Sequence, residues 1–595
     1  MPLSVSYNMT IVPYLTSALA SIAVLGYLIA KIFPWIKYDF TNIRIIAQVC
    51  VRRLQYRNKL LIEIFEEKVD KIPKKTFLIF QDERYSYEFA DKQMNKIART
   101  ALTVGIKKGD IVAVLMTNSP NFIWTAYDEK LITVVEELYP DLEAQGIKVY
   151  VIGAKDKILH NGFQLLDDIF ANASDQRPIK NSLDGIDYCT PICYIFTSGT
   201  TGLPKAAIIS QDKAVKGALL MNMASVGKND IVYTPLPLYH SAAGLIALGV
   251  VVVKGATLVL SSKFSASHFM EDCCKHKVTA IQYIGELCRY LCLTPKSAND
   301  KNHCIRVAVG NGLRPDIWKE FSDRFNIPNI FEFYAATEGN VILFNPVNKF
   351  GSIGRSSPLL ELLVPIAIIK FDVITEQPVR GDDGFCKRVA FNEPGLMVAL
   401  IKNNFKFDGY KGNRSLSEKK VLRDVFKKGD LYFNSGDLME LDEDYFIYFK
   451  DRTGDTFRWK GENVSTGEVA NVLTDISWIE DANVYGVHIP GQDGRAGMAS
   501  LSLMQGDLSN TDLQTISDQC CGLLPSYAWP RFIRIQNTHN MTSTFKLQKM
   551  DLVKEGFDPE KVKPNPLYYL DLGKRTYLPL TAEPYHNIVS GKIRL

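Results

Sequence analysis

The chain has 595 residues, which is too long for one ordinary domain, and its 46% hydrophobic and 23% charged residues are ordinary for a folded globular protein. The formal net charge of +4 is small for this length and gives no support to a nucleic-acid-binding function. The 11 cysteines are scattered without a C-x-x-C pair, and no H-E-x-x-H motif occurs. This usage favours reduced, cytosol-facing thiols over a disulfide framework or a structural metal site.

The N-terminal segment predicts a membrane anchor. Residues 11–33 are apolar except for Lys31 near their end, and a stretch of this length can span a bilayer. No basic residue precedes the stretch, whereas seven follow between Lys31 and Lys59. The positive-inside rule therefore predicts a single-pass transmembrane helix within residues 1–34, with the rest of the chain in the cytosol. A cleaved signal peptide, with a weak site near residues 17–20, is the alternative, but such peptides begin with positive charge.

The basic segment 35–60 leads from this anchor into the body of the protein. From residue 42 to residue 65, Ile, Val and Leu mix with Arg at near-helical spacing. Two interpretations remain open. The helix lies on the membrane surface through its basic side, or it is an ordinary amphipathic helix that docks against the protein.

Strand-like and helix-like patterns then alternate up to about residue 440, which predicts layered α/β structure. The strand-like runs are residues 76–80, 111–116, 149–152, 231–233, 257–260, 280–283 and 306–309. Shorter elements follow Asp451, with a boundary near residues 452–455. The sequence thus predicts a large domain over residues 61–451 and a small α+β domain over residues 452–595.

The most informative motif occupies residues 194–205, with the sequence YIFTSGTTGLPK between two strand-like runs. Gly199 and Gly202 allow backbone N–H groups to turn inward around an anion, and Lys205 adds a point charge suited to phosphate. The hydroxyl groups of the loop and of the strand before it belong to Tyr194, Thr197, Ser198, Thr200 and Thr201. The pattern predicts an ATP phosphate loop that is not a Walker A loop, because G-x-x-x-x-G-K-[ST] is absent and a strand follows. A solvated turn is the alternative.

A second group of candidate nucleotide-binding residues follows two other strand-like runs. Tyr334 offers an aromatic face for a base, and Thr337 and Glu338 offer oxygen ligands for a phosphate and its Mg²⁺ ion. The residues at the end of the preceding strand are Gly310, Asn311 and Gly312. These would leave room for a ligand beside the sheet. Taken alone, the first group also fits a helix N-terminus, and the second also fits a tight turn.

The remaining candidates are scattered along the chain. Asp437 follows a strand-like run, where a carboxylate can accept from ribose hydroxyls, and Arg452 supplies a cation. The others are Lys460, Gly461, Lys546 and His240. The first two lie in a polar, Gly-rich loop, the third follows a turn of small residues, and the histidine, in the sequence PLPLYHS, would line an acyl pocket. A surface ion pair, a solvated lysine and a structural histidine are the alternatives.

Together and in this order, these motifs resemble the adenylate-forming superfamily of acyl-CoA synthetases, luciferases and peptide-synthetase adenylation domains. The resemblance is closer still to the fatty acid transport proteins, also called very-long-chain acyl-CoA synthetases. The segments that carry it are residues 194–205, 310–314, 334–340, 451–463, 483–487, 494–500, 524–528 and 530–532. The block 451–463 is the most specific, and the resemblance runs from the membrane segment almost to the C-terminus.

The resemblance implies a ligase that works in two steps. A fatty carboxylate attacks the α-phosphate of MgATP, giving an acyl-adenylate, and after rotation of the small mobile domain the thiol of coenzyme A displaces AMP. Lys546 would bridge the carboxylate and the α-phosphate, while the loop from Thr197 to Lys205 would hold the β- and γ-phosphates. Lys460 and Gly461 would turn inward for the second step about a hinge near Gly454.

The resemblance also implies the remaining ligands. Glu338 and Thr200 would serve magnesium, Tyr334 would stack on adenine, and Asp437 with Arg452 would hold the ribose. The substrate would be a long- or very-long-chain fatty acid, taken up at the endoplasmic reticulum or the plasma membrane. A bile-acid or other acyl-CoA ligase is a variant of the same class.

The chain departs from the family in two places. After Tyr127 the sequence jumps to Asp128, which resembles a later point of the family, so that roughly forty residues, about one βαβ unit, are absent. Losing a strand predicts exposed sheet edges and uncovered apolar faces. Ser543 stands where the family has Gly, and Trp529 where it has Arg. The missing unit keeps open an alternative function, a membrane-bound acyl-binding or transport protein with weak or no ligase activity.

Overall fold

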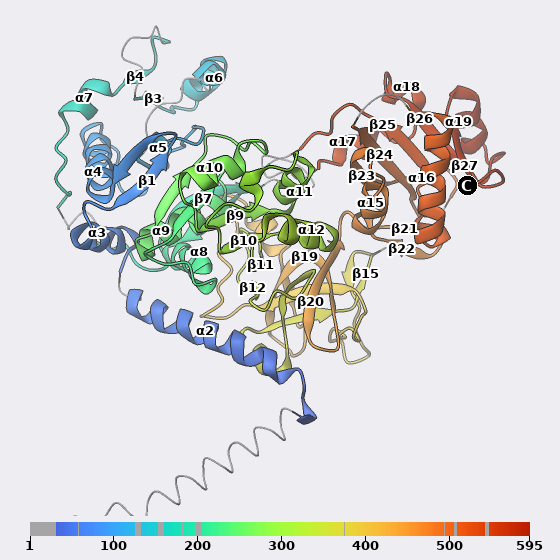
Figure 1. Ribbon diagram of the computed structural model, residues 1–595, viewed down its shortest axis with the longest axis horizontal. Helices are drawn as coiled ribbons and strands as arrows, with labels where there is room; N and C mark the ends of the chain where they lie inside the picture. The colour runs from blue at the N-terminus through green and yellow to red at the C-terminus, as the bar shows by residue number, and fades with distance from the viewer. Residues whose placement is uncertain are drawn as a thin grey trace, which may run out of the picture.

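The computed structural model describes residues 31–57, 59–124, 132–152, 160–179, 184–197, 204–373, 375–492, 494–504, 508–541 and 547–595. The described chain is an α/β fold, in which a large region with two main sheets is joined to a smaller sheet region at the C-terminus (Figure 1). The α/β class predicted from the sequence is confirmed.

The central sheet of the large region has eight strands in the order β12-β11-β10-β9-β7-β8-β1-β2. In chain order they are β1 (Thr76–Phe80), β2 (Glu83–Ser86), β7 (Ile231–Thr234), β8 (Thr257–Leu260), β9 (Ala280–Ile284), β10 (Val307–Asn311), β11 (Ile330–Ala335) and β12 (Ile342–Asn345). The inner strands pair in parallel, and β2 and β12 close the two edges in antiparallel. Parallel strands buried on both faces read as continuous apolar runs, which is why five of the predicted strands are found here.

Helices bury the apolar faces of this sheet, and the largest hydrophobic core lies between them and the strands. The helices of this region are α3 (Leu61–Lys71), α4 (Tyr87–Thr103), α5 (Pro120–Trp124), α8 (Gln211–Met223), α9 (Leu248–Lys254), α10 (Phe269–Lys275), α11 (Gly285–Leu293) and α12 (Pro315–Phe325), with a π-helix over Ala242–Ala247 and a 3-10 turn over Ala298–Asp300. Helix α8 begins where Ser210 ends a strand, because the Ser210 hydroxyl accepts a hydrogen bond from the N–H of Lys213.

The second main sheet carries residues of the candidate site on its longest strands. Its order is β13-β20-β19-β17-β14, and β18 also pairs with β19. The strands are β13 (Ser352–Arg355), β14 (Ile366–Ile369), β17 (Gly395–Leu400), β18 (Val421–Arg423), β19 (Leu431–Leu441) and β20 (Phe446–Arg452). Small neighbours are α13 (Pro358–Leu363), α14 (Arg414–Glu418) and the pair β15 (Phe371–Asp372) and β16 (Gln377–Pro378). A separate hairpin of β5 (Pro191–Thr197) and β6 (Lys205–Ser210) flanks the predicted phosphate loop.

The C-terminal region has its own five-stranded sheet, in the order β23-β24-β25-β26-β27. The strands are β23 (Ile479–Val487), β24 (Ala496–Leu503), β25 (Phe532–Ile535), β26 (Leu567–Asp571) and β27 (Thr576–Pro579), after the hairpin β21 (Phe457–Trp459) and β22 (Glu462–Val464). The helices are α15 (Thr466–Thr474), α16 (Asn510–Leu523), α17 (Met550–Glu555), α18 (Pro559–Val562) and α19 (Ala582–Val589), with a 3-10 turn over Ser526–Ala528. Its buried core draws only on residues from Phe457 onwards.

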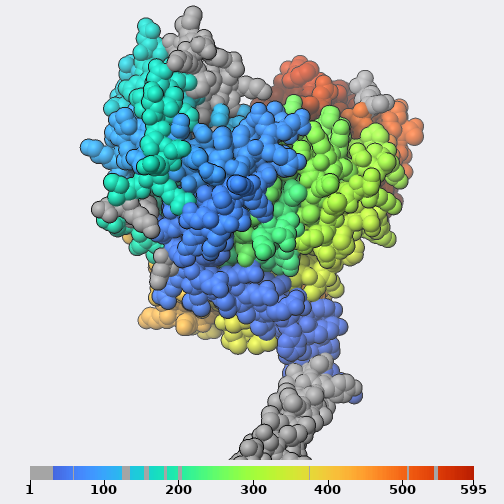
Figure 2. All heavy atoms as spheres, turned by 60° about the vertical axis from the view of Figure 1, so that its left-hand side comes forward, coloured from blue at the N-terminus to red at the C-terminus, as the bar shows by residue number. Residues whose placement is uncertain are grey.

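Helix α2 (Ile36–Tyr56) docks across the lower part of the large region (Figures 1 and 2). Its only acidic residue, Asp39, is buried and bonded to Arg355 Nη2 at 2.8 Å and to the hydroxyl of Ser357 at 2.5 Å. The opposite side of α2 leaves Phe40 67% and Leu54 65% exposed. The docking interpretation of this segment is therefore confirmed, and membrane contact through its outer side stays a prediction.

The predicted transmembrane segment falls mostly outside the described residues, since residues 1–30 are not among them. Within the described ranges, no helix is both long and apolar enough to cross a bilayer.

One predicted strand, residues 111–116, is wrong. Residues 111–117 have no regular secondary structure and pair with no strand of the described chain, and the side chains of Ile111 and Leu115 are 62% and 53% exposed. The elements that follow are α6 (Ile132–Ala144), the two-residue strands β3 (Tyr150–Val151) and β4 (Gln164–Leu165), and α7 (Asp167–Asn172). Figure 1 shows them as a group at the outer edge of the large region. The apolar run is present, but the neighbouring strand that would make it part of a sheet is not in the described structure.

Candidate active site

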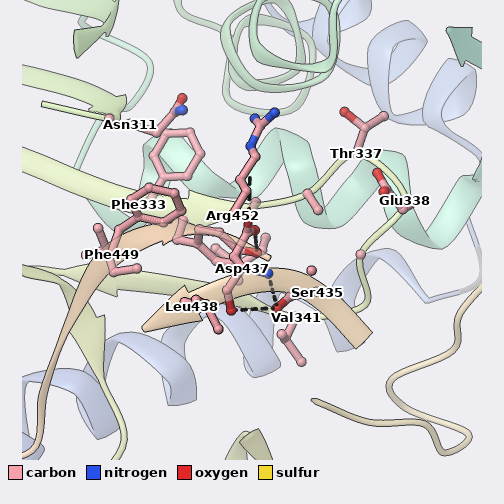
Figure 3. A pocket seen from close by; sticks show the side chains of 18 of the residues that line it. Asn311, Phe333, Thr337, Glu338, Val341, Ser435, Asp437, Leu438, Phe449 and Arg452 are labelled. Atoms are coloured by element: carbon pink, nitrogen blue, oxygen red, sulfur yellow. Dashed lines mark hydrogen bonds and ion pairs between the residues drawn. The ribbon is translucent and has the colours of Figure 1, made fainter. Parts of the chain in front are cut away.

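A cavity of about 2020 Å³ lies where the two main sheets of the large region meet the C-terminal region. Its walls come from the carboxyl ends of β9, β10 and β11, from β19 and β20, from α8 and the π-helix, and from the first turn of α15. In open α/β sheets, ligands bind outside the carboxyl ends of the strands, so the cavity stands where the fold class predicts a site. Figure 3 shows the part of it around Asp437.

Of the three predicted nucleotide-binding residues at the end of β10, two line the cavity and one does not. Asn311 and Gly312 line the cavity. Gly310 is not among the lining residues, and a Cβ atom there would lie 2.3 Å from the carbonyl oxygen of Tyr283. The glycine is therefore explained by the close approach of Tyr283 on the neighbouring strand, without a ligand.

Tyr334, Asp437 and Arg452 meet at one side of the cavity. Residues 437 and 452 stand opposite each other on β19 and β20, which brings Arg452 Nε to 4.0 Å from Asp437 Oδ1. The Tyr334 hydroxyl donates to Asp437 Oδ2 at 2.5 Å, and burial raises the pKa of Tyr334 well above its usual value, so the phenol keeps its proton. In Figure 3 the Arg452 side chain extends from its strand toward the space bordered by Asn311 and Thr337. The group offers a carboxylate, a cation and an aromatic ring, which suits a nucleoside.

A second polar cluster surrounds Glu338. The Tyr410 hydroxyl donates to Glu338 Oε1 at 2.8 Å, and the Thr337 and Ser241 hydroxyls lie 3.0 Å apart. Burial lowers the pKa of Lys420, whose ammonium group lies near Glu338 and Asp437 and donates to the Ser435 carbonyl at 3.1 Å. This cluster joins the nucleoside side of the cavity to the predicted phosphate loop.

The predicted phosphate loop is described only at its ends. Thr197 ends β5 and Lys205 begins β6; both line the cavity, and the Thr197 hydroxyl donates to the Lys205 carbonyl at 3.2 Å. Lys205 Nζ lies 5.9 Å from the centre of the Tyr410 ring, which places its charge beside the Glu338 cluster. Tyr194 lies on β5 and is not among the lining residues. The residues that lie outside the described chain are Ser198, Gly199, Thr200, Thr201 and Gly202.

Part of the cavity wall, here called the apolar arm, carries apolar residues of α8 and the π-helix. They are Gly217 and Leu220 on α8 and Leu245 and Ile246 on the π-helix. His240, just before the π-helix, also lines the cavity. An apolar wall beside polar groups suits a ligand with a hydrocarbon chain and a charged end.

Two residues that follow the candidate Lys546 in the chain line the cavity. Leu547 and Lys549 line the cavity, whereas Lys546 itself lies outside the described residues. Lys460 and Gly461 form the turn between β21 and β22, with φ angles of 51° and 87°, and are not among the described lining residues.

Contacts across the boundary hold the C-terminal region in this orientation. The Asp451 carboxylate, on β20, accepts from the N–H of Thr466 at 2.7 Å. Arg289 of α11 donates to the carbonyl oxygen of Glu480 at 2.8 Å. These contacts flank Gly454, so rotation at that point would have to break them.

Several polar residues that line the cavity were not predicted from the sequence. They are Lys213, Asp408, Tyr410, Lys420 and Lys549. Each stands alone in a segment without a motif, and a lone lysine or tyrosine is usually a surface residue. The one signal available was the position of Lys213 in the first turn of a helix directly after a strand of the phosphate-loop hairpin.

The donor set fits a phosphate-bound magnesium ion better than a protein-caged metal. Among the described residues, no group of three or more His, Cys, Asp and Glu side chains is placed to hold a metal. Mg²⁺ bound to a nucleotide usually takes one or two carboxylates and completes its shell with phosphate and water. Glu338, facing the cavity beside Lys205, meets that need.

Comparison with known proteins assigns the chain to a family. A family model described as an AMP-binding enzyme matches residues 65–127 and 146–365. Long-chain fatty acid transport protein 2 of Rattus norvegicus is 40% identical, over 98% of this chain and 100% of that protein. Long-chain fatty acid transport protein 6 of Mus musculus is also 40% identical, over 98% and 99%.

Solved structures show the same fold at low sequence identity. O-succinylbenzoate coenzyme A synthetase from Bacillus subtilis, in complex with ATP and magnesium, aligns with a TM-score of 0.64 at 20% identity, covering 82% of this chain and 99% of that one. The anthranilate CoA ligase AuaEII, in complex with anthranoyl-AMP, aligns with a TM-score of 0.68 at 17% identity, covering 83% and 97%.

One of these comparisons is interrupted near the predicted junction, and another shows that a relative is longer than this chain. The family match stops at residue 127 and resumes at residue 146. The alignment with the rat protein extends over 626 positions, more than the 595 residues of this chain, and includes the whole of that protein. The relative therefore has sequence without a counterpart here. With 40% identity along nearly the full length of both, the chain belongs to the family of long-chain fatty acid transport proteins.

Proposed function

We propose that this chain activates long- or very-long-chain fatty acids to acyl-CoA through an acyl-adenylate, using ATP, Mg²⁺ and coenzyme A. The observation that carries the proposal is the cavity itself. It joins a nucleoside-binding group, a carboxylate–lysine cluster and an apolar arm in one space of about 2020 Å³. A nucleotide, its metal-bound phosphates and an acyl chain each find chemically matching walls there.

In the adenylation step, the chain's own residues would place the reactants. Tyr334, Asp437 and Arg452 would hold the nucleoside, and Glu338 would orient the magnesium-bound phosphates. The negative charge that builds up on phosphate oxygens is stabilised by fixed cations. These would be Lys205 and Lys546, whose neighbour Leu547 lines the cavity.

Lys546 is the first residue to test. Lys546→Ala should lower the rate of acyl-adenylate formation by about 100-fold or more while ATP still binds, because its charge acts mainly on the transition state. The measurement is fatty-acid-dependent release of pyrophosphate by the full-length chain. Lys554→Ala, a change of an exposed lysine on α17, is the control. Near-normal pyrophosphate release from Lys546→Ala would contradict the assignment.

The thioester step would need a second orientation of the C-terminal region. In the present one, Lys460 and Gly461 are not among the lining residues, and the proposed rotation near Gly454 would bring them to the reacting atoms in place of Lys546. Lys460→Ala should therefore still form acyl-adenylate but transfer it slowly to coenzyme A. Equal losses in both half-reactions would refute a scheme with two orientations.

The proposed setting is a membrane of the endoplasmic reticulum or the cell surface, where activation would be coupled to fatty acid uptake. The support is the apolar segment 11–33, which leads directly into the docked helix α2. Release of the full-length protein by carbonate washing would contradict a membrane anchor.

A second candidate function is acyl binding or transport with weak or no ligase activity. The exposed apolar run at residues 111–115 favours it, because a large region without part of its sheet would not close around its substrates. Fatty acid binding by the full-length chain without any ATP-dependent adenylate would select this function.

A further inference from the structure

Lys213 places a buried cation in the wall of the cavity. The residue lies in the first turn of α8, where its N–H donates to the Ser210 hydroxyl, and it forms part of the cavity wall. The stem of the side chain is partly exposed, but the ammonium nitrogen is buried and has no hydrogen-bond partner in the described chain. Burial lowers the pKa of Lys213 to about 8.

A buried ammonium group without hydrogen-bond partners destabilises the folded protein when no ligand is bound. Its three N–H donors lose water without gaining an acceptor, and a buried donor without a partner destabilises the fold by about 1–3 kcal/mol, more when it is charged. A surface lysine at this position would avoid that penalty. The placement of the group is therefore explained better by an anion that enters the cavity than by folding.

The two carboxylates that face Lys213 are engaged elsewhere. Asp408 accepts from the Ser210 hydroxyl at 3.0 Å, and Glu338 accepts from the Tyr410 hydroxyl at 2.8 Å. The other charged neighbour, Lys216, adds like charge and pairs with Asp212 at 2.6 Å. Asp408 and Glu338 thus attract the ammonium from a distance and hold it in the wall without using its donors.

We propose that Lys213 donates to the β- or γ-phosphate oxygens of ATP, and to the pyrophosphate formed from them, near Glu338. The inference rests on the proposed function. Lys205 stands beside the Tyr410 ring, Tyr410 bonds to Glu338, and the charge of Glu338 acts on Lys213, so both cations lie near the carboxylate that would orient magnesium.

A phosphate fits this position better than the carboxylate of the acyl substrate. Asp408 and Glu338 already face the ammonium group, and a third carboxylate would meet two like charges. A triphosphate carries several negative charges, and its magnesium ion would offset the charge of Glu338. Lysine also suits a phosphate as a compact point charge.

The test separates the phosphate chain from the rest of the nucleotide. The full-length chain and its Lys213→Met and Lys213→Arg variants are titrated with AMP and with α,β-methylene-ATP in the presence of Mg²⁺. Loss of one charged hydrogen bond should weaken binding of the ATP analogue about 10- to 100-fold in Lys213→Met, while AMP binding changes less than about twofold. Lys213→Arg, which keeps the charge, should recover most of the loss. Lys554→Met, at the exposed lysine of α17 that is not among the lining residues, is the control and should bind both ligands like the parent.

Each other outcome overturns the inference. Equal weakening of AMP and the ATP analogue in Lys213→Met would assign Lys213 to folding alone. Weaker binding of fatty acid with unchanged binding of the ATP analogue would assign the group to the acyl carboxylate. If the parent chain bound neither nucleotide, the proposed function would fail together with this inference, whereas the first two results would leave the proposed function standing.

Discussion

Two apolar runs of the large region have similar compositions, but one forms a buried strand and the other is exposed without regular secondary structure. Residues 257–260 form β8, which pairs with β7 on one side and β1 on the other, and Leu258 is fully buried. Residues 111–116 are as rich in Ile, Val and Leu, yet form no strand, and Val112 and Leu115 are 56% and 53% exposed. Strand preference in a sequence reflects how well a segment fits between neighbours, so the same pattern gives a core strand or an exposed coil according to what lies beside it.

The difference points to sequence that the relatives have and this chain lacks. The exposed run ends a few residues before the point where the family match stops, at residue 127. A βαβ unit inserted there would return a strand and covering helices to this side of the sheet. Three changes to the chain test this explanation.

Restoring the segment should have the largest effect. A chain that carries the relatives' residues between Tyr127 and Asp128 should bury Ile111, Val112 and Leu115, and unfolding should become less favourable by about 5 kcal/mol, since each large apolar side chain contributes about 1.5–3 kcal/mol when buried. Calorimetric melting and acyl-CoA synthesis of the two chains provide the measurement. Equal melting temperatures and equal synthesis would show that the gap is harmless.

A matched pair of truncations should have the next largest effect. Leu258→Ala removes a side chain that is fully buried, and should lower the free energy of unfolding by about 2–5 kcal/mol. Leu115→Ala removes the same atoms from an exposed position, and should change it by less than about 0.5 kcal/mol. Denaturant unfolding of both variants checks the contrast. A loss of similar size in both would mean that residues 111–116 are packed in solution.

The smallest effect on stability is expected from a charge placed in the exposed run. Val112→Lys should leave the melting temperature within about 1 °C, because the replaced side chain buries little area. It should nevertheless slow aggregation, since a lysine interrupts an apolar segment that other chains could pair with. Light scattering during incubation near 37 °C measures this. Aggregation at the parent's rate would show that association does not start from this segment.

The strands predicted correctly are those whose own residues form a recognisable hydrophobic pattern. Residues 257–260 and 280–283 are continuous apolar runs because parallel strands are buried on both faces, and both are strands. Residues 111–116 could not be predicted in the same way, because their state depends on a partner that lies elsewhere in the chain. Local pattern carries no information about whether that partner is present.

The residues of the candidate site also fall into two groups, those that belong to sequence motifs and those that only the tertiary structure brings to the cavity. Asp437 and Arg452 belong to recognisable motifs, and their cross-strand pairing confirms that they lie together. Lys213 and Tyr410 reach the cavity through tertiary packing, Tyr410 because its segment bridges to β6 at Ala207. No spacing rule links positions that are brought together by different elements, so such residues are found only once the fold is known.

The buried pair of Asp39 and Arg355 ties helix α2 to the second sheet. Arg355 lies in β13, β13 pairs with β20, and β20 ends in Arg452 at the wall of the cavity. A pull on α2 would therefore be transmitted to the cavity through the second sheet. If the C-terminal region rotates as proposed, the distance from the start of α2 to Arg452 should stay constant while it does.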